Sequence, residues 1–472
     1  MNFNSFPYKW LVAVAFVMAL FMDIMDTTIV NVALPTLTEN LHANNTSLEW
    51  VVNAYLLSLA IWIPASGWLG DRYGTKKIFL FALLMFTLGS ALCGFAWSVS
   101  SLIFFRVLQG IGGGMMTPVG TAMLFRAFPP HERAQASSIM TIPIAFSPAL
   151  GPVLGGWLVD FVGWRWIFYV NIPIGIAAFL FSLKFLREHT EKNAGNFDLA
   201  GFLLSGFGLV FLLYALSLEP LKGLMNPEII FSGILGIVLL IALVKVEQRN
   251  KYPLLHFGLF NERLFRTTNI IMFFAFAVWL GFLFVLPLFL QELRGLSALD
   301  SGLTTFPQAL GWLVISLVAA RFYPKLGPKK MITWGLVGAM IFTFVFVFIN
   351  TETNLWIFRL IMFFRGITMG FAIIPIQAAT FTNIPSEESG RASSFFNTNR
   401  QVASSFGVAL LGTILFQLLG TQMSLPTQLF AYHMTFIVAT GFGVIAILFA
   451  LTIKDEDAAA SMVKTVDNPV SE

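Results

Sequence analysis

Fourteen apolar segments of about 20 residues, separated by short polar loops, dominate this chain of 472 residues. A segment of that length can cross the hydrocarbon core of a bilayer as an α-helix. Charged residues make up only 11% of the chain, against about 25% in soluble domains, which excludes a water-soluble enzyme. The sequence therefore predicts an all-α polytopic membrane protein with transmembrane helices near residues 10–34, 48–69, 78–98, 101–124, 135–159, 165–185, 198–218, 228–246, 267–292, 301–322, 331–349, 355–377, 390–419 and 430–452.

The basic residues are unequally divided between the two sides of the predicted membrane. With the N-terminus placed in the cytoplasm, 21 of the 28 Lys and Arg residues fall on the cytoplasmic side, three fall outside and four lie in or beside spans. Cytoplasmic loops of membrane proteins carry the excess of positive charge. This asymmetry predicts two cytoplasmic termini and an even number of spans.

Three short motifs occur twice, in the same order. Arg72-Tyr-Gly-Thr-Lys-Lys77 matches Lys325-Leu-Gly-Pro-Lys-Lys330, Gln109-Gly-Ile111 matches Arg365-Gly-Ile367, and Arg133-Ala-Gln-Ala-Ser-Ser138 matches Arg391-Ala-Ser-Ser394, at offsets of 253, 256 and 258 residues. The first six spans occupy only about 185 residues, so two extra helices are expected between two six-helix halves. The predicted units are an N-terminal six-helix bundle, two inserted helices with a cytoplasmic linker, a C-terminal six-helix bundle and a disordered cytoplasmic tail, at residues 1–190, 191–264, 265–453 and 454–472.

A turn rich in Gly and charge follows the second predicted span. It reads Gly67-Trp-Leu-Gly-Asp-Arg-Tyr-Gly-Thr-Lys-Lys77 and resembles the G-x-L-a-D-r-x-G-r-k signature of the major facilitator superfamily, with Thr75 where the family usually has Arg. In that family the Asp faces the positive end of a helix in the other half, a contact of about 0.3–2 kcal/mol that acts as a latch. The alternative is a merely basic cytoplasmic loop. The resemblance implies a conformational latch formed by Gly67, Asp71, Arg72, Gly74 and Lys76.

The fourth span contains Arg106-Val-Leu-Gln-Gly-Ile-Gly-Gly-Gly114. A charged side chain inside the bilayer costs roughly 2.5 to 17 kcal/mol, depending on the method, and so requires a reason. The segment resembles the R-x-x-q-G-x-g-g signature of the same superfamily, which implies a role for Arg106 in proton coupling. The alternative is an Arg side chain that extends to the outer interface.

The fifth span contains Ser147-Pro-Ala-Leu-Gly-Pro-Val-Leu-Gly-Gly156, which resembles the g-x-x-x-G-P-x-x-G-G signature of the superfamily's antiporters, with Ser147 in place of the first Gly. Proline removes a backbone donor and bends a helix, and glycines let helices pack closely. A generic kinked helix is the alternative. The resemblance favours exchange over uptake and points to Gly151, Pro152, Gly155 and Gly156.

The first span contains Met25-Asp-Thr-Thr-Ile-Val-Asn-Val-Ala-Leu-Pro35, which resembles the L-D-x-T-I-V-N-V-A-L-P segment of the fourteen-span drug:proton antiporter family. Asp26 occupies its acidic position. Low-dielectric surroundings favour the neutral form of a carboxyl group, so Asp26 is the candidate proton carrier. Asp23 lies one helical turn earlier on nearly the same face, and two carboxylates that close can titrate as a pair. For each, the alternative is a polar group that is capped or bound to water.

Seven polar residues in the spans are candidates for the wall of a substrate cavity among Phe, Met and Trp side chains: Asn31, Tyr55, Gln109, Gln291, Gln308, Gln377 and Asn397. The chain has no Walker A motif, and its five His residues have no metal-ligand spacing. We therefore expect no ATP-driven transport and no metal site. The single Cys93 excludes an intramolecular disulfide.

The resemblance extends over residues 10–452 and implies a secondary active transporter, not an enzyme, with no cofactor and a proton gradient as its energy source. We expect it to export hydrophobic cationic or neutral compounds by alternating access, from the bacterial cytoplasmic (inner) membrane. Export of an endogenous metabolite, amino acid, siderophore or lipid fits the same features, and a receptor or channel is a third interpretation. The expected partners are small hydrophobic substrates, protons and the lipid bilayer, with no nucleic acid. We expect a monomer and leave open an accessory periplasmic or outer-membrane partner.

Overall fold

The computed structural model describes residues 7–41, 45–191, 195–222, 225–419 and 424–462, and within these ranges all regular secondary structure is helical. The prediction of an all-α protein is confirmed. The first helices are α1 (Tyr8–Leu41), α2 (Asn45–Tyr73), α3 (Thr75–Gly94), α4 (Val99–Ala127), α5 (Arg133–Phe161), α6 (Trp166–Tyr169) and α7 (Asn171–Phe185). Two helices follow, α8 (Leu199–Lys222) and α9 (Pro227–Glu247). The remainder are α10 (Arg263–Leu288), the π-helix η4 (Phe289–Leu293), α11 (Ala298–Thr305), α12 (Pro307–Phe344), α13 (Leu355–Thr380), α14 (Ser389–Leu419), α15 (Leu425–Leu451) and α16 (Ala459–Met462).

Twelve segments of the described residues are long and apolar enough to cross a membrane. One of them, Leu299–Phe348, has 50 residues and contains a non-helical residue, Gly327, inside α12. The 29-residue helix α5 lies outside these twelve segments and has a similar length. The lengths and compositions of these helices make the chain a multi-pass membrane protein.

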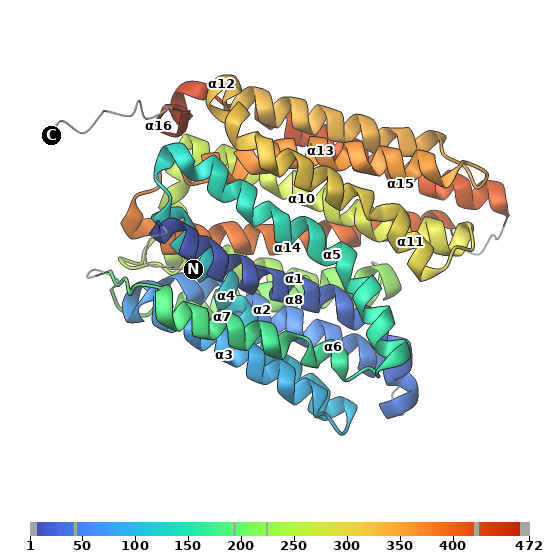
Figure 1. The fold of residues 1–472 in the computed structure, drawn as a ribbon, viewed down its shortest axis with the longest axis horizontal. Helices are drawn as coiled ribbons and strands as arrows, with labels where there is room; N and C mark the ends of the chain where they lie inside the picture. The colour runs from blue at the N-terminus through green and yellow to red at the C-terminus, as the bar shows by residue number, and fades with distance from the viewer. Residues whose placement is uncertain (1–6, 42–44, 192–194, 223–224, 420–423, 463–472) are drawn as a thin grey trace.

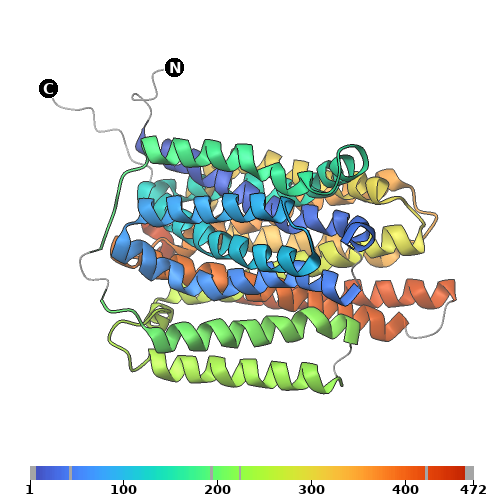
Figure 2. The same ribbon diagram turned by 90° about the horizontal axis from the view of Figure 1, so that it is seen from below.

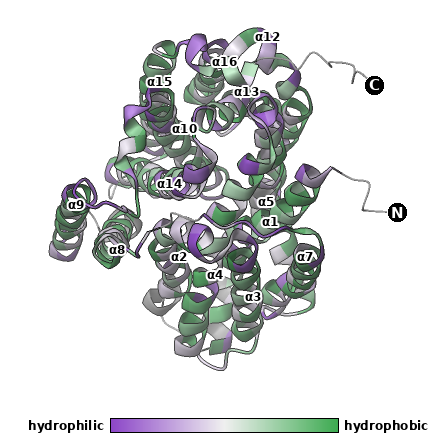
Figure 3. Ribbon diagram, turned by 90° about the vertical axis from the view of Figure 1, so that its left-hand side faces the viewer, coloured by the Kyte–Doolittle hydropathy of each residue, from purple (hydrophilic) through white to green (hydrophobic). Residues whose placement is uncertain are grey.

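The long helices run side by side along one axis. The start of α1 and the helix α16 lie at the same end, on the left in Figures 1 and 2. We call this end the terminal end and the opposite one the distal end. In the view from the terminal end, α1 to α7 form one group and α10 to α16 another (Figure 3). Helix α8 contacts α2 of the first group, α14 of the second and α9, so this pair of helices lies beside the junction of the two groups.

Local sequence explains where several helices begin and end. The Ser98 hydroxyl accepts a hydrogen bond from the Ser101 N–H at 3.2 Å, and the two side chains form a capping box at the start of α4. Gly74 separates α2 from α3 with a φ of 105°, and Gly327 interrupts α12 with a φ of 74°. Both values favour glycine over residues with a Cβ. These two glycines occupy the same position in the repeated basic motif, so the internal repeat extends to the backbone conformation.

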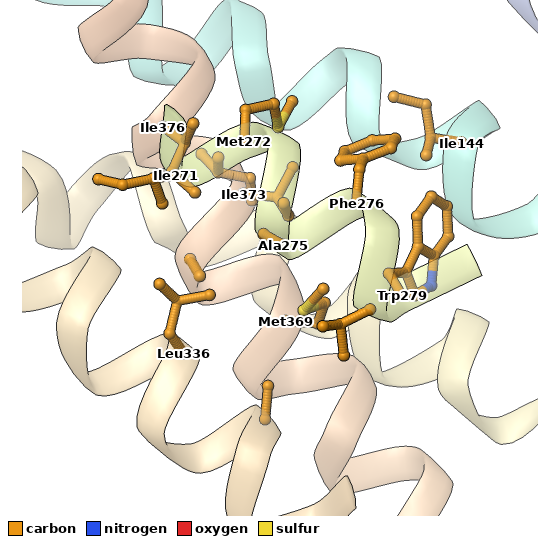
Figure 4. Close-up of a cluster of buried hydrophobic side chains, with 14 of the residues drawn as sticks. Ile144, Ile271, Met272, Ala275, Phe276, Trp279, Leu336, Met369, Ile373 and Ile376 are labelled. Atoms are coloured by element: carbon orange, nitrogen blue, oxygen red, sulfur yellow. The ribbon is translucent and has the colours of Figure 1, made fainter. Parts of the chain in front are cut away.

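Interdigitated apolar side chains hold the helices together. Figure 4 shows one such cluster, in which Met272 and Ala275 of α10 lie near Met369 and Ile373 of α13 and near Leu336 of α12. The same cluster extends to α5 of the other group. Many large apolar side chains remain exposed on the outer faces of the helices, as expected for surfaces that contact lipid. Because a span in this protein is apolar on all sides, burial of apolar surface does not by itself define which face of a helix points inward.

Candidate functional site

A cavity of about 920 Å³ lies between the two helix groups. Its wall comes mainly from α1 and α2 on one side and from α10, α11 and α14 on the other. On α10 the lining begins at Phe276 and continues to Pro287, in the half of the helix farther from the terminal end, and Gln291 of η4 continues it. The cavity therefore extends from the middle of the molecule toward the distal end. Its size is within the range of small-molecule sites, roughly 300–1,000 Å³.

At the terminal end the two groups are in direct contact. The Gly67 N–H donates to the Ser394 hydroxyl at 2.9 Å, and the Ser393 hydroxyl donates to the Pro118 carbonyl at 2.6 Å. The rings of Phe125 and Phe381 stack with centroids 4.3 Å apart. Each contact joins one group to the other, so access between the groups is closed at the terminal end.

Asp26 and Arg106 form a buried ion pair between α1 and α4. The Asp26 side chain is 0% exposed and the Arg106 side chain 1% exposed. Asp26 Oδ1 also accepts hydrogen bonds from Gln109 Nε2 at 2.8 Å and from Asn171 Nδ2 at 3.1 Å. The Arg106 guanidinium donates to the Val51 carbonyl at 3.1 Å. An ion pair withstands burial only when its remaining donors and acceptors are satisfied, and these neighbours supply that compensation.

Asp23 faces the cavity instead, although it lies one helical turn from Asp26. Its Oδ1 accepts a hydrogen bond from the Tyr55 hydroxyl at 2.6 Å, and its Oδ2 accepts one from the Thr117 hydroxyl at 2.7 Å. The Arg106 guanidinium lies over the Tyr55 ring, 4.2 Å from its centroid. Tyr55 thus contacts both the carboxylate at the cavity wall and the buried ion pair. The two carboxylates have different surroundings, one at a cavity wall and one between packed helices.

The predicted latch residues lie at the contact between the groups. Asp71 is 3.5 Å from Arg126 of α4 and lies next to the first residues of α14, because a Cβ on Gly390 would lie 2.7 Å from Asp71 Oδ2. Arg126 also lies 3.6 Å from Glu191 in the segment after α7. Asp71 therefore faces the N-terminus of a helix in the other group, the geometry in which a carboxylate interacts favourably with the helix dipole.

The remaining latch residues have different surroundings. Gly67 packs against the Gly390 backbone, and Gly74 supplies the sharp turn before α3. Lys76 Nζ donates to the Leu183 carbonyl at 2.7 Å, within the same helix group. The Arg72 side chain is exposed. Of the five predicted latch residues, Gly67 and Asp71 contact the other group in the part of the chain that the structure describes.

The antiporter-like segment lies in α5. Gly151 packs against Thr28 of α1, and Gly155 is buried. A Cβ on Gly156 would meet nothing within 4 Å. The side chain of Pro152 lies outside the described part of the structure. Close approach between α1 and α5 thus depends on Gly151 rather than on all the glycines of the motif.

Three of the seven candidate cavity residues line the cavity: Tyr55, Gln291 and Asn397. Gln109 belongs to the Asp26 cluster, Gln308 accepts a hydrogen bond from Arg365 at 2.7 Å, and Gln377 is 0% exposed. These three lie between packed helices and not at the cavity wall. The Asn31 side chain lies outside the described residues. The position of a polar residue within a span did not predict whether it lines the cavity. In a helix that is apolar on all sides, the packing of neighbouring helices determines which side faces the cavity.

Sequence reasoning missed four residues near the site. Thr117 and Asn171 bind the two carboxylates, Arg400 lines the cavity, and Arg365 is fully buried beside Gln308. Both arginines fall in or beside predicted spans in the sequence. A charged side chain inside the membrane is energetically costly, so its presence there indicates a function. Among the described residues, no group of three or more His, Cys, Asp and Glu side chains is arranged to hold a metal ion.

Solved structures with the same arrangement of helices include the human organic anion transporter MFSD10 (TETRAN), at a TM-score of 0.68 and 14% identity over 94% of this chain and 100% of that one. The proton:xylose symporter XylE aligns at a TM-score of 0.66 and 16% identity, over 94% of this chain and 95% of that one. At these identities the likeness shows the fold alone.

Sequence relatives are closer. The multidrug resistance protein B homolog of Mycobacterium tuberculosis (strain ATCC 25618 / H37Rv) is 34% identical over 403 residues, which cover 84% of this chain and 75% of that protein. The uncharacterized MFS-type transporter YhcA of Bacillus subtilis (strain 168) is 30% identical over 396 residues, 84% of this chain and 74% of that protein. The sequence pattern of the Major Facilitator Superfamily matches residues 16–408. The chain belongs to the major facilitator superfamily of membrane transporters.

Proposed function

We propose that this transporter is a proton-coupled multidrug efflux antiporter of the fourteen-span type, which exports hydrophobic cationic or neutral compounds by alternating access. The observation that carries the proposal is the buried Asp26–Arg106 pair beside a cavity between two helix groups. The name of the mycobacterial relative, a multidrug resistance protein B homolog, supports a role in multidrug export. A proton gradient would drive the exchange, without a cofactor.

The proposed topology has fourteen membrane crossings. The 50-residue segment Leu299–Phe348 is long enough for two crossings, because one needs about 20 residues, and its interruption at Gly327 supports this division. Helix α5, of 29 residues, would supply the fourteenth. The proposed units are two six-helix bundles at 1–190 and 265–453, the inserted helices at 191–264 and the tail at 454–472, much of which lies outside the described residues.

The terminal end is proposed to be cytoplasmic, in the inner membrane of a bacterium. The 21 basic residues assigned to that side, against three on the other, support this orientation. The structure would then be outward-facing, since its cavity extends to the distal end. The Asp71 contact with α14 would act as the latch that keeps the cytoplasmic end closed, and the Gly151 segment as the exchange motif. A monomer would suffice for this mechanism, and a periplasmic or outer-membrane partner would receive the substrate if one exists.

Proton coupling is proposed to act through the stability of the buried pair. A proton on Asp26 would remove the negative charge that compensates Arg106. Leaving one charge of a buried pair uncompensated costs about 3–5 kcal/mol. Such a cost is large enough to change which of two conformations is favoured. Asp23, linked to this pair through Tyr55, would modulate the exchange from the cavity side.

Transport in reconstituted vesicles tests this proposal. Asp26→Asn should abolish export driven by a pH gradient while leaving substrate binding measurable, because the variant keeps the shape of the side chain and loses its proton. A matched control is Asp300→Asn, an exposed carboxylate at the start of α11, which should transport normally. Substrate-induced proton release from the purified protein in detergent gives a second readout. Normal gradient-driven export by Asp26→Asn would refute the assignment.

A further inference from the structure

Arg400 of α14 is a basic side chain at the cavity wall with donor groups to spare. Its guanidinium lies over the Phe276 ring, 5.9 Å from the centroid, and both residues line the cavity. In the described ranges, this guanidinium donates no hydrogen bond to another residue and forms no ion pair within 4.0 Å. An Arg has five N–H donors and no acceptor. Arg400 can therefore bind an anionic group of a molecule in the cavity.

Asp23 is the acidic counterpart, and it comes from the other helix group. Arg400 and Asp23 interact electrostatically but do not form an ion pair. The Tyr55 and Thr117 hydroxyls each donate one hydrogen bond to Asp23. Because an ionised carboxylate has about four acceptor positions, it can still accept bonds from a cationic group. The cavity thus presents one positive and one negative group on opposite helix groups.

A third charged side chain at the wall, Arg106, does not change the balance of one positive and one negative charge. Arg106 also borders the cavity, but its charge is compensated by Asp26, which is fully buried behind it. Among the described residues no further Asp, Glu, Lys or Arg lines the cavity. Much of the remaining surface is apolar and includes the rings of Phe276, Trp279 and Phe284. A ligand that complements this wall has two opposite charges, no net charge and an apolar body.

We infer that the cavity recognises hydrophobic zwitterions, with the anionic group bound by Arg400, the cationic group by Asp23 and the apolar body by the aromatic wall. This inference rests on the proposed function, since it names a substrate class within the net-neutral compounds proposed above. A simple cation occupies Asp23 but is repelled by Arg400 and leaves that guanidinium without an acceptor. A simple anion can bind Arg400 but is repelled by Asp23 and leaves that carboxylate without a cationic partner. The cavity would distinguish zwitterions from simple ions in two ways. A zwitterion pairs with both charges of the wall, and a simple ion leaves one of them unpaired.

Three dyes with related ring systems make the test direct. Rhodamine B is a zwitterion, its ethyl ester is a cation with the same rings, and fluorescein is an anion. Binding is measured by fluorescence anisotropy with the purified full-length protein in detergent. The wild type should bind rhodamine B at least about tenfold more tightly than either of the others, the range expected for one hydrogen-bonded charge. This comparison requires no variant and so does not depend on a variant folding.

Substitutions then assign the preference to residues. Arg400→Gln should weaken rhodamine B binding by about 10- to 100-fold. It should not weaken binding of the ester, which has no anionic group for Arg400 and is freed from the repulsion. Asp23→Asn should weaken the binding of both rhodamine B and its ester, because each has a cationic group. Arg249→Gln, at an exposed position after α9, is the matched control and should change neither affinity.

Several results would overturn the inference. The first is equal affinity of the wild type for rhodamine B and its ester, and the second is binding of none of the dyes. The third is an equal loss of affinity for both dyes in Arg400→Gln, which would indicate a structural role for Arg400. Vesicle transport separates this inference from the proposed function. Gradient-driven export of the ester as fast as that of rhodamine B contradicts the zwitterion preference alone. A zwitterion preference with no dependence on the pH gradient contradicts the proton-coupled function alone.

Discussion

Gly67→Ala tests the physical basis of the closed terminal end. Gly67 of α2 lies against the backbone of α14, where a Cβ would be 2.5 Å from the Gly390 carbonyl oxygen and 2.7 Å from Ser394 Oγ. Real Cβ atoms essentially never approach other atoms within 3.0 Å, so the two helices must separate. The 2.9 Å hydrogen bond from the Gly67 N–H to Ser394 would be strained by the same movement.

The cost falls on one conformation only. Overpacking of a close contact costs about 1–3 kcal/mol, and this contact joins the two helix groups. If the groups separate at this end when the transporter changes state, the added Cβ does not destabilise the open conformation. At about 1.4 kcal/mol per factor of ten, the equilibrium should shift toward the open terminal end by about 5- to 150-fold. The gain in helix propensity from Gly to Ala, about 1 kcal/mol, applies to both conformations and cancels.

Distances between spin labels at the terminal end measure this shift. Tyr73→Cys on α2 and Glu387→Cys before α14 provide exposed labelling sites on the two groups, and the single native Cys93 is buried. Gly441→Ala is the matched control, because a Cβ there meets nothing within 4 Å. A longer distance in Gly67→Ala but not in Gly441→Ala is the expected result. Identical distance distributions in Gly67→Ala and the wild type would refute the reasoning.

Three further predictions concern the buried pair, the cavity wall and the packing of α14. Asp26→Asn and Arg106→Gln should each destabilise the protein by about 3–5 kcal/mol, whereas the double variant should cost less than their sum; thermal unfolding in detergent measures this, and additive effects would contradict a direct pair. A Cys at Gln291 should react with a membrane-impermeant maleimide added from the distal side and a Cys at Gln377 should not, and equal reactivity would contradict the described cavity. Gly407→Ala should lower the unfolding free energy by about 1–3 kcal/mol, because its Cβ would overlap the α10 backbone; an unchanged melting temperature would argue against this packing.

Much of the fold was predictable because the bilayer restricts the choice of structure. Only helices or closed barrels satisfy their backbone groups in lipid, so apolar segments of about 20 residues already imply transmembrane helices. The internal repeat was also detectable, and the positive φ angles of Gly74 and Gly327 show that it includes the turn itself. Between the predicted spans 301–322 and 331–349, α12 is interrupted at Gly327.

The candidate site was only partly predictable. Asp26 and Arg106 were singled out separately, and only the structure shows that they bind each other. Asp23 was expected on nearly the same helix face as Asp26, but Asp23 faces the cavity while Asp26 is enclosed. Gln308 was expected at the cavity wall and instead binds Arg365. Arg400 was one of the four basic residues counted in or beside spans, and no role was predicted for it.

The sequence alone determined the composition of this protein's membrane-spanning part: apolar segments, the cost of each charge within them, and glycines where the chain turns. Tertiary structure decided which charges pair and which face the cavity. The physical reason is that the spans are apolar on nearly every side, so hydrophobicity specifies that a helix enters the membrane but not its rotation. Rotation follows from close packing at sites such as Gly67 and Gly151 and from the partners available to buried polar groups. That rotation encloses Asp26 with Arg106 and leaves Asp23 and Arg400 at the cavity wall.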